Sequence, residues 1–316
     1  MTKPILFIDG ESGTTGLEIR AHLAARDDVE IISIAQEKRK DSAERKNFLN
    51  NCDLAILCLP DDAAREAIGL IENPNVRVLD ASTAHRTASG WVYGFPELAP
   101  DQADKIRASK RVGNPGCYPT GMLALIRPLV DGGIIPADYG ITVEAISGYS
   151  GGGKELIAIC EAAEATERAA AFCLYGLDQN HKHLSEMRIH AGLTRDPIFL
   201  PSYSSRIYRG MLIRIAMRLD DLNRLTGKRT DAVTLHDVLA ARYKGRKYVQ
   251  VEPLQERLDK NYVLTPLTQN QTNNLQLRVF SNPEKEIIIL TACLDNLGKG
   301  ASGAAVQNVE IMLGLG

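Results

Sequence analysis

The sequence has no cysteine framework, no strong charge of either sign and no long hydrophobic run. Its six cysteines among 316 residues include no Cys-x-x-Cys pair, which argues against a structural metal site or a disulfide scaffold. The formal net charge of −2 provides no basic field for nucleic acid. No apolar stretch approaches the ~18 residues of a membrane span, and no signal peptide is recognisable. We therefore expect a soluble, cytoplasmic protein with no metal, no nucleic-acid partner and no membrane partner.

The composition is sufficient for a folded core. Hydrophobic residues make up 44% of the chain, and a length of 316 residues predicts two domains. We find no internal repeat and no low-complexity segment.

One cysteine, Cys117, lies between a turn and an apolar segment. Residues 113–120 are Gly-Asn-Pro-Gly-Cys-Tyr-Pro-Thr, and residues 122–130 have the composition of a helix. A thiol at a helix N-terminus is close to unpaired N–H groups and the positive end of the dipole, and both favour the thiolate. The pattern predicts a nucleophile, and the alternative is a small buried residue after a turn. The other cysteines, mostly in apolar segments, are expected to be inert: Cys52, Cys58, Cys160, Cys173 and Cys293.

The N-terminus has the order of a dinucleotide-binding unit. Residues 4–9 are a short apolar run typical of a buried parallel strand, and an amphipathic segment begins at Leu17. A glycine-rich loop between them predicts a pyrophosphate site, because glycines let the backbone approach the oxygens and the helix N-terminus supplies donors. An ordinary turn is the alternative. The candidate cofactor residues of this loop are Gly10, Ser12, Gly13, Thr14, Thr15 and Gly16.

The next expected strand ends at Gln36 rather than at an acid. An acid there would bind the ribose 2′-hydroxyl of NAD. Lys38, Arg39 and Lys40 follow instead, and cations without the acid favour the 2′-phosphate of NADP. The alternative is a solvated charged loop, which Glu37 supports.

Alternating strands and helices continue along the first part of the chain. We expect further strands over 29–35, 54–59 and 77–80, with a helix over 63–71. This alternation predicts a Rossmann-like, doubly wound parallel sheet over residues 1–118. Ser82 and Arg86 follow the strand that ends at 80, so they are candidate ligand contacts at the carboxyl edge. A helix cap and a surface cation are the alternative roles.

The rest of the chain has a different pattern. Long strands over 211–219 and 286–294, with a helix over 234–243, predict an α+β domain at 119–296 with a mostly antiparallel sheet. An apolar helix over 304–315 lies in a third segment, 297–316, which we expect to return to the dinucleotide-binding domain.

A strand expected over 141–147 leads into a glycine-rich segment. Residues 151–153 are three consecutive glycines directly before Lys154. They predict a flexible anion-binding loop, and a linker is the alternative.

Two histidines, His181 and His183, flank Lys182 and are followed by Glu186. Metal binding would require both rings on one side, which this spacing gives only in a strand, and no third ligand is evident. A histidine that pairs with the thiol or moves a proton is the better hypothesis.

Together these segments resemble the N-acetyl-gamma-glutamyl-phosphate reductases, of the shorter, type 2 branch. The resemblance covers nearly the whole chain, although the glycine loop is shared with aspartate-semialdehyde dehydrogenases. Two departures from the longer branch are Ser202, where that branch has the histidine of a Pro-His-Leu segment, and Ser185, where it has proline. The segments that carry the resemblance are 10–16, 113–120, 147–154, 181–186 and 295–308.

The resemblance implies an NADPH-dependent reduction of N-acetyl-L-glutamyl 5-phosphate to the 5-semialdehyde and phosphate, in arginine biosynthesis. Cys117 would form a thioester, and either His181 or His183 would act as acid and base. The resemblance also implies a homotetramer. Gly300 is expected near the cofactor. The candidate substrate contacts are Arg86, Asn114, Ser150, Lys154, Glu186 and Arg209.

Two other functions remain open at this point. An aspartate-semialdehyde dehydrogenase would use the same thiol and cofactor on a shorter acyl phosphate. A dinucleotide-sensing binding protein would retain the fold, but its Cys117 would be no more reactive than a surface thiol.

Overall fold

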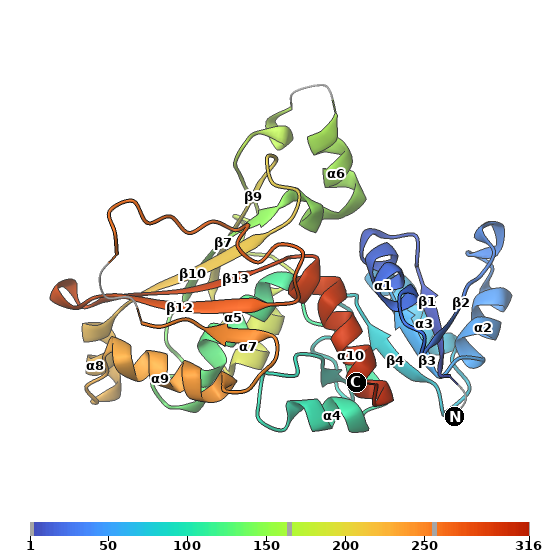
Figure 1. Ribbon diagram of the computed structural model, residues 1–316, viewed down its shortest axis with the longest axis horizontal. Helices are drawn as coiled ribbons and strands as arrows, with labels where there is room; N and C mark the ends of the chain where they lie inside the picture. The colour runs from blue at the N-terminus through green and yellow to red at the C-terminus, as the bar shows by residue number, and fades with distance from the viewer. Residues whose placement is uncertain (1–2, 163–165, 255–257, 316) are drawn as a thin grey trace. The chain divides into compact units, whose positions relative to one another are not determined.

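The computed structural model describes residues 3–162, 166–254 and 258–315. These residues form two compact units, residues 1–116 with 301–316 and residues 117–300 (Figure 1). No helix among the described residues is long and apolar enough to cross a membrane.

The first unit contains a parallel sheet of six strands, as the alternating pattern predicts. Their order is β2-β1-β3-β4-β6-β5, and all five pairings are parallel. The continuous apolar run of β3 is fully buried, because helices cover both faces of the sheet. The strands are β1 (Ile5–Asp9), β2 (Glu30–Ile32), β3 (Leu54–Leu57), β4 (Arg77–Asp80), β5 (Val92–Tyr93) and β6 (Arg111–Gly113).

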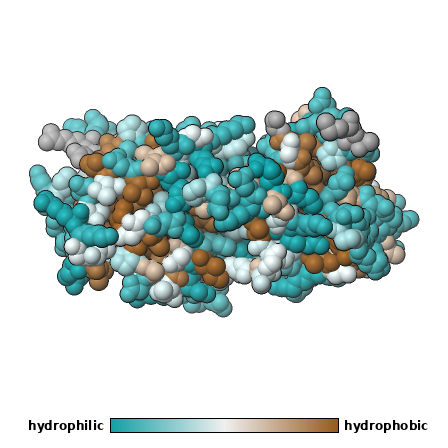
Figure 2. Space-filling view, turned by 90° about the horizontal axis from the view of Figure 1, so that it is seen from below, coloured by the Kyte–Doolittle hydropathy of each residue, from teal (hydrophilic) through white to brown (hydrophobic). Residues whose placement is uncertain are grey.

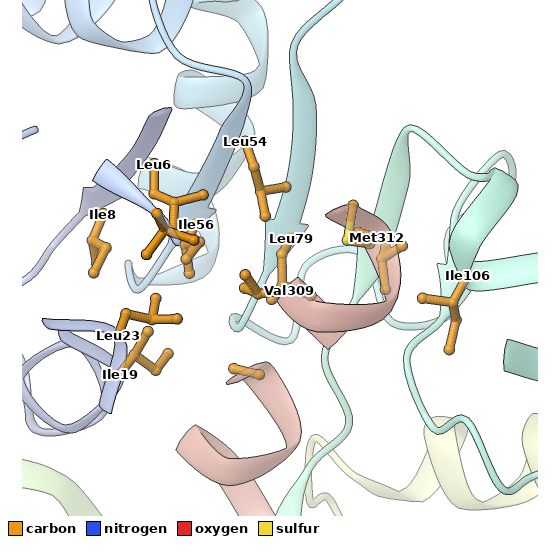
Figure 3. Close-up of a cluster of buried hydrophobic side chains, with 13 residues drawn as sticks. Leu6, Ile8, Ile19, Leu23, Leu54, Ile56, Leu79, Ile106, Val309 and Met312 are labelled. Atoms are coloured by element: carbon orange, nitrogen blue, oxygen red, sulfur yellow. The ribbon is translucent and has the colours of Figure 1, made fainter. Parts of the chain in front are cut away.

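Successive residues of β1 point to opposite faces and contribute to two separate cores. Leu6 and Ile8 belong to a cluster that includes Ile19 of α1 and Val309 of α10 (Figure 3). Phe7 belongs to a second cluster on the other face. The C-terminal helix α10 therefore packs on the sheet of the first unit. The helices are α1 (Thr14–Ala24), α2 (Ser42–Asn50), α3 (Asp61–Leu70), α4 (Gln102–Ala108) and α10 (Gly303–Leu313).

The second unit contains a mixed sheet of seven strands in the order β11-β12-β13-β10-β7-β9-β8. Four neighbouring pairs are antiparallel, and two, β7 with β9 and β11 with β12, are parallel. The expected mostly antiparallel sheet is therefore confirmed. The strands are β7 (Thr142–Gly148), β8 (Cys173–Leu174), β9 (Ile198–Ser204), β10 (Met211–Arg218), β11 (Val249–Val251), β12 (Leu275–Asn282) and β13 (Ile287–Leu294).

Helix α5 packs directly on this sheet. An added Cβ at Gly121 would overlap the Ile213 side chain of β10 and lie 3.2 Å from Cβ of Ala292 of β13. Glycine at this position lets the helix approach closely, and α7 and α9 lie beside it on the same face (Figure 1). The helices are α5 (Cys117–Asp131), α6 (Gly153–Glu161), α7 (Leu184–Ala191), α8 (Leu219–Thr226) and α9 (Ala232–Tyr243).

The glycine-rich segment after β7 is helical, so the expected flexible loop or linker is wrong. Residues Tyr149–Gly152 form a 3₁₀ turn, and Gly153 begins α6. An added Cβ at Gly148 would lie 2.5 Å from the Tyr208 carbonyl oxygen, and one at Gly152 would overlap Leu156. Gly148 and Gly152 thus serve close packing, whereas Gly153 has φ +70°, a conformation that favours glycine.

The face shown in Figure 2 is mostly hydrophilic, with hydrophobic patches between the polar residues. Such a mixture is ordinary for a protein surface.

Candidate active site

The glycine loop of the first unit forms the expected tight turn between β1 and α1. Gly10 has φ +86°, and an added Cβ there would overlap the carbonyl oxygen of Cys58. An added Cβ at Gly16 would lie 2.5 Å from the Gly10 carbonyl oxygen. Helix α1 begins at Thr14, so the first-turn N–H groups of Thr14, Thr15 and Gly16 have no intrahelical acceptor. These residues fit a bound pyrophosphate.

Two of the basic residues expected near the ribose differ in what they contact. Arg39 Nη1 donates to Ser12 Oγ in the glycine loop at 3.3 Å. Lys38 Nζ instead pairs with Glu44 at 2.7 Å. The preceding strand ends at Ile32, earlier than expected, and Gln36 is exposed in a short 3₁₀ turn. Of Lys38 and Arg39, Arg39 is therefore the one that reaches the glycine loop.

The polar turn after β4 is held by a buried carboxylate that the sequence analysis missed. Asp80 Oδ2 accepts from Ser82 Oγ at 2.8 Å and lies 2.6 Å from His85 Nδ1. Arg86 Nη2 donates to the Ala81 carbonyl at 3.1 Å. Ser82 and Arg86 thus both have bonds within the turn.

Asn114 is buried and engaged at both ends of its amide. Its Nδ2 donates to the Ala301 carbonyl at 3.0 Å, and its Oδ1 accepts from Asn308 Nδ2 at 3.0 Å. The side chain therefore braces the start of α10 inside the first unit.

Cys117 is the first residue of α5, in the second unit. The N–H groups of the first turn and the helix dipole both favour its thiolate. Gly300 lies against it, because an added Cβ there would be 2.8 Å from Cβ of Cys117. Gly300 was expected beside the cofactor, and within the second unit its direct neighbour is the candidate nucleophile.

The two histidines lie side by side although no strand holds them. Their ring centroids are 4.8 Å apart, and the His183 N–H donates to His181 Nδ1 at 3.2 Å. Because Nδ1 accepts, the neutral His181 ring carries its proton on Nε2. Burial, followed by the charge of Lys182, lowers the pKa of His181 to about 4. No group of three metal-ligating side chains occurs among the described residues.

A cavity of about 590 Å³ lies in the second unit. Tyr118, which directly follows Cys117, and His181 both line it, whereas His183 is buried at the start of α7 and does not. Its other lining residues are Ser147, Gly148, Gly151, Gly152, Leu156, Glu167, Arg168, Cys173, Leu174, Tyr175, Lys182 and Tyr203.

The remaining substrate candidates of the second unit have different environments. Arg209 Nε bonds to the fully buried Asp295 at 2.8 Å. Ser150 is buried, and its Oγ accepts from Asn296 Nδ2 at 3.0 Å. Lys154 is exposed in the first turn of α6, and Glu186 is buried in α7.

Asp295, Tyr118 and Tyr175 also belong to this site, although the sequence did not predict them. Only Tyr118 carried a local signal, its position directly after the candidate nucleophile. The other two are brought to the site by the pairing of distant strands.

Family models match two parts of the chain. The model of the semialdehyde dehydrogenase NAD-binding domain matches residues 38–106, and that of the semialdehyde dehydrogenase dimerisation domain matches residues 117–296. The chain thus carries a binding domain for a nicotinamide dinucleotide.

Solved structures show the same fold. Aspartate semialdehyde dehydrogenase II from Vibrio cholerae has a TM-score of 0.73 at 17% identity over 99% of both chains. Aspartate semialdehyde dehydrogenase with NADP from Candida albicans has a TM-score of 0.67 at 14% identity over 99% of both chains.

Curated relatives are much more similar in sequence. N-acetyl-gamma-glutamyl-phosphate reductase 2 of Nostoc sp. is 50% identical over 100% of this chain and 98% of its own length. The Pseudomonas putida protein of that name and the reductase of Burkholderia orbicola are each 49% identical over 99% of this chain and 98% of their own. The resemblance inferred from the sequence is thereby confirmed: this chain belongs to the N-acetyl-gamma-glutamyl-phosphate reductases, oxidoreductases of amino-acid biosynthesis that act on an acyl phosphate.

Proposed function

We propose that the protein reduces N-acetyl-L-glutamyl 5-phosphate to N-acetyl-L-glutamate 5-semialdehyde and phosphate, using NADPH, in arginine biosynthesis. The relatives' names supply the substrate class. The observation that carries the proposal is the position of Cys117 at the start of α5, directly before a residue that lines the large cavity. We further propose a cytoplasmic homo-oligomer, with the tetramer as the expected assembly.

The first step is attack on the acyl phosphate by the Cys117 thiolate. A bond forms between Sγ and the acyl carbon, and the bond from that carbon to the phosphate oxygen breaks. Phosphate leaves with the electron pair, and a thioester remains on Cys117. The first-turn N–H groups of α5 would hold the oxyanion that develops.

The glycine loop of the first unit would hold the cofactor, which supplies a hydride when bound. The N–H groups of Thr14, Thr15 and Gly16 would bind the pyrophosphate. Arg39 would bind the 2′-phosphate, because it reaches Ser12 of the same loop and no acid replaces Gln36. This arrangement supports NADP rather than NAD.

The thiohemiacetal that hydride addition leaves must lose its hydroxyl proton while the carbon–sulfur bond breaks. We assign the proton transfer to His181 rather than His183, because only His181 lines the cavity. The carboxylate of the bound substrate, which stays after phosphate leaves, carries negative charge, which raises a histidine pKa. Bound substrate would therefore raise the pKa of His181 toward neutral pH, where the ring can both accept and donate a proton.

Charged residues of the second unit would hold the substrate's anionic groups. Arg209 is our main candidate for the phosphate or carboxylate, because Asp295 fixes one edge of its guanidinium. Lys154 is the second cation, and the buried Glu186 and Ser150 are further candidate substrate contacts.

Steady-state assays with NADPH test the proposal, offering N-acetyl-L-glutamyl 5-phosphate and, separately, aspartyl phosphate. We expect turnover of the acetylated substrate and a loss of about three orders of magnitude or more in Cys117→Ser. A preference for aspartyl phosphate would instead support the aspartate-semialdehyde dehydrogenase alternative. Absence of turnover on both, with an unreactive Cys117 thiol, would support the dinucleotide-sensing alternative.

A further inference from the structure

Two tyrosines in the cavity wall form a hydrogen-bonded chain. The Tyr118 hydroxyl lies 3.3 Å from the Ser202 carbonyl oxygen, and the Tyr175 hydroxyl lies 2.9 Å from that of Tyr118. The Tyr118 hydroxyl donates to the Ser202 carbonyl, which only accepts, and it also hydrogen-bonds the Ser147 side chain, while its oxygen accepts from Tyr175. The Tyr175 proton then points to Tyr118, and the Tyr175 oxygen remains available only as an acceptor.

Neither phenol ionises in the working range of the enzyme. Burial raises the pKa of both Tyr118 and Tyr175, so both hydroxyls stay protonated at neutral pH. Within the part of the chain that the structure describes, no group donates to the Tyr175 oxygen. A ligand in the cavity is therefore the natural source of a donor.

The position of Tyr175 also fits a contact with substrate. Its ring centroid lies 5.9 Å from that of His181, the proposed proton-transfer residue. Leu156 and Leu174 supply apolar surface in the same cavity, and Lys182 supplies a cation. Arg168 adds a second cation to the lining and Glu167 one carboxylate, so cations outnumber anions there, and a neutral N–H with a small apolar group beside it matches the lining better than a free ammonium.

We propose that the Tyr175 hydroxyl oxygen accepts a hydrogen bond from the amide N–H of the substrate's N-acyl group, and that this contact selects N-acylated substrates. The inference rests on the proposed function, which it refines. The cavity of about 590 Å³ has ample room for a small acylated amino-acid side chain.

The test compares two aldehydes in the reverse reaction, with phosphate and NADP present. One is N-acetyl-L-glutamate 5-semialdehyde, and the other is its ester analogue, in which an oxygen replaces the amide N–H. An ester oxygen facing an acceptor oxygen loses the bond and adds repulsion. We expect the unmodified protein to favour the amide about 10- to 100-fold in kcat/KM.

Two variants locate the contact. Tyr175→Phe removes the acceptor, and we expect the preference to fall to about threefold or less. Tyr118→Phe instead frees the Tyr175 proton to donate to the ester, so the preference falls because ester turnover rises. The two variants are distinguished by which substrate changes, and circular dichroism with thermal melting shows whether each is folded.

Tyr203→Phe is the matched control. Tyr203 lines the same cavity, but its hydroxyl donates to the Arg168 carbonyl at 2.7 Å. Its amide preference should equal that of the unmodified protein. A folded Tyr175→Phe that keeps the full preference, or a Tyr203→Phe that loses it, would overturn the assignment. If the unmodified protein does not turn over the N-acetyl aldehyde at all, the proposed function itself is wrong, and the inference is lost with it.

Discussion

Replacing Gly300 by alanine tests the packing that positions the nucleophile. The new Cβ would lie 2.8 Å from Cβ of Cys117 and 3.2 Å from the Asp295 carbonyl oxygen. An ordinary contact begins near ~3.4 Å, so Cys117 or the Gly298–Ser302 π-helix must move by about 0.6 Å. Misplacement of a reacting group by about 1 Å costs roughly 10²-fold. We therefore expect kcat to fall about 10- to 100-fold while the protein stays folded.

Three measurements check this expectation. Steady-state kinetics give kcat and KM, alkylation by iodoacetamide gives the reactivity of Cys117, and thermal melting gives stability. Gly69→Ala is the matched control, because Gly69 is exposed within α3 and an added Cβ there meets nothing within 4 Å. Its kcat should not change, and alanine should favour the helix by about 1 kcal/mol. A Gly300→Ala protein with unchanged kcat and unchanged alkylation rate would refute the packing argument.

Three further predictions follow from the site. His181→Asn should lower kcat by about 10² to 10⁴. His183 is buried outside the cavity, so His183→Asn should lower stability more than kcat. Equal small losses of kcat in the two variants would exclude the acid–base role of His181. Arg39→Ala should reduce the preference for NADPH over NADH by about tenfold at low salt. Lys38→Ala should reduce it much less, because the Lys38 ammonium pairs with Glu44. The kcat/KM values for both cofactors check both expectations. The pKa of His181 is lowered to about 4 in the folded protein, whereas in the unfolded chain it is ~6.5. Between these two pH values the unfolded chain binds more protons than the folded protein, so the free energy of unfolding should decrease as the pH falls from ~6.5 to about 4. Urea denaturation across that range should show a smaller decrease in His181→Asn; an equal decrease in both proteins would contradict the assigned pKa.

Local sequence was sufficient for much of the fold. The strand over 77–80 has the expected bounds, and the helices α1, α5, α9 and α10 lie where apolar periodicity and turn signals place them. These elements are specified by residues near one another in the chain. The short strands β5, β6, β8 and β11 were not predicted, because two or three residues carry no measurable periodicity, and the longer strands β9 and β12 were not predicted either.

Side-chain partners were beyond the reach of sequence reasoning. The three glycines before Lys154 predicted flexibility, but Gly152 packs against Leu156, and nearby Gly148 packs against Tyr208, which lies on a distant segment. The pairing of Arg209 with Asp295 joins residues 86 positions apart. Such contacts depend on the register between strands, which neither segment specifies alone.

The most direct test of the account is to trap the acyl group on Cys117. The protein is mixed with N-acetyl-L-glutamyl 5-phosphate in the absence of NADPH, quenched in acid, digested and examined by mass spectrometry, while released phosphate is measured in parallel. We predict an N-acetylglutamyl thioester on the peptide that contains Cys117, with about one phosphate released per subunit, and neither product in Cys117→Ser. Continued turnover by Cys117→Ser at more than a tenth of the normal rate, or full turnover by the unmodified protein without an acylated Cys117 peptide, would contradict the covalent mechanism.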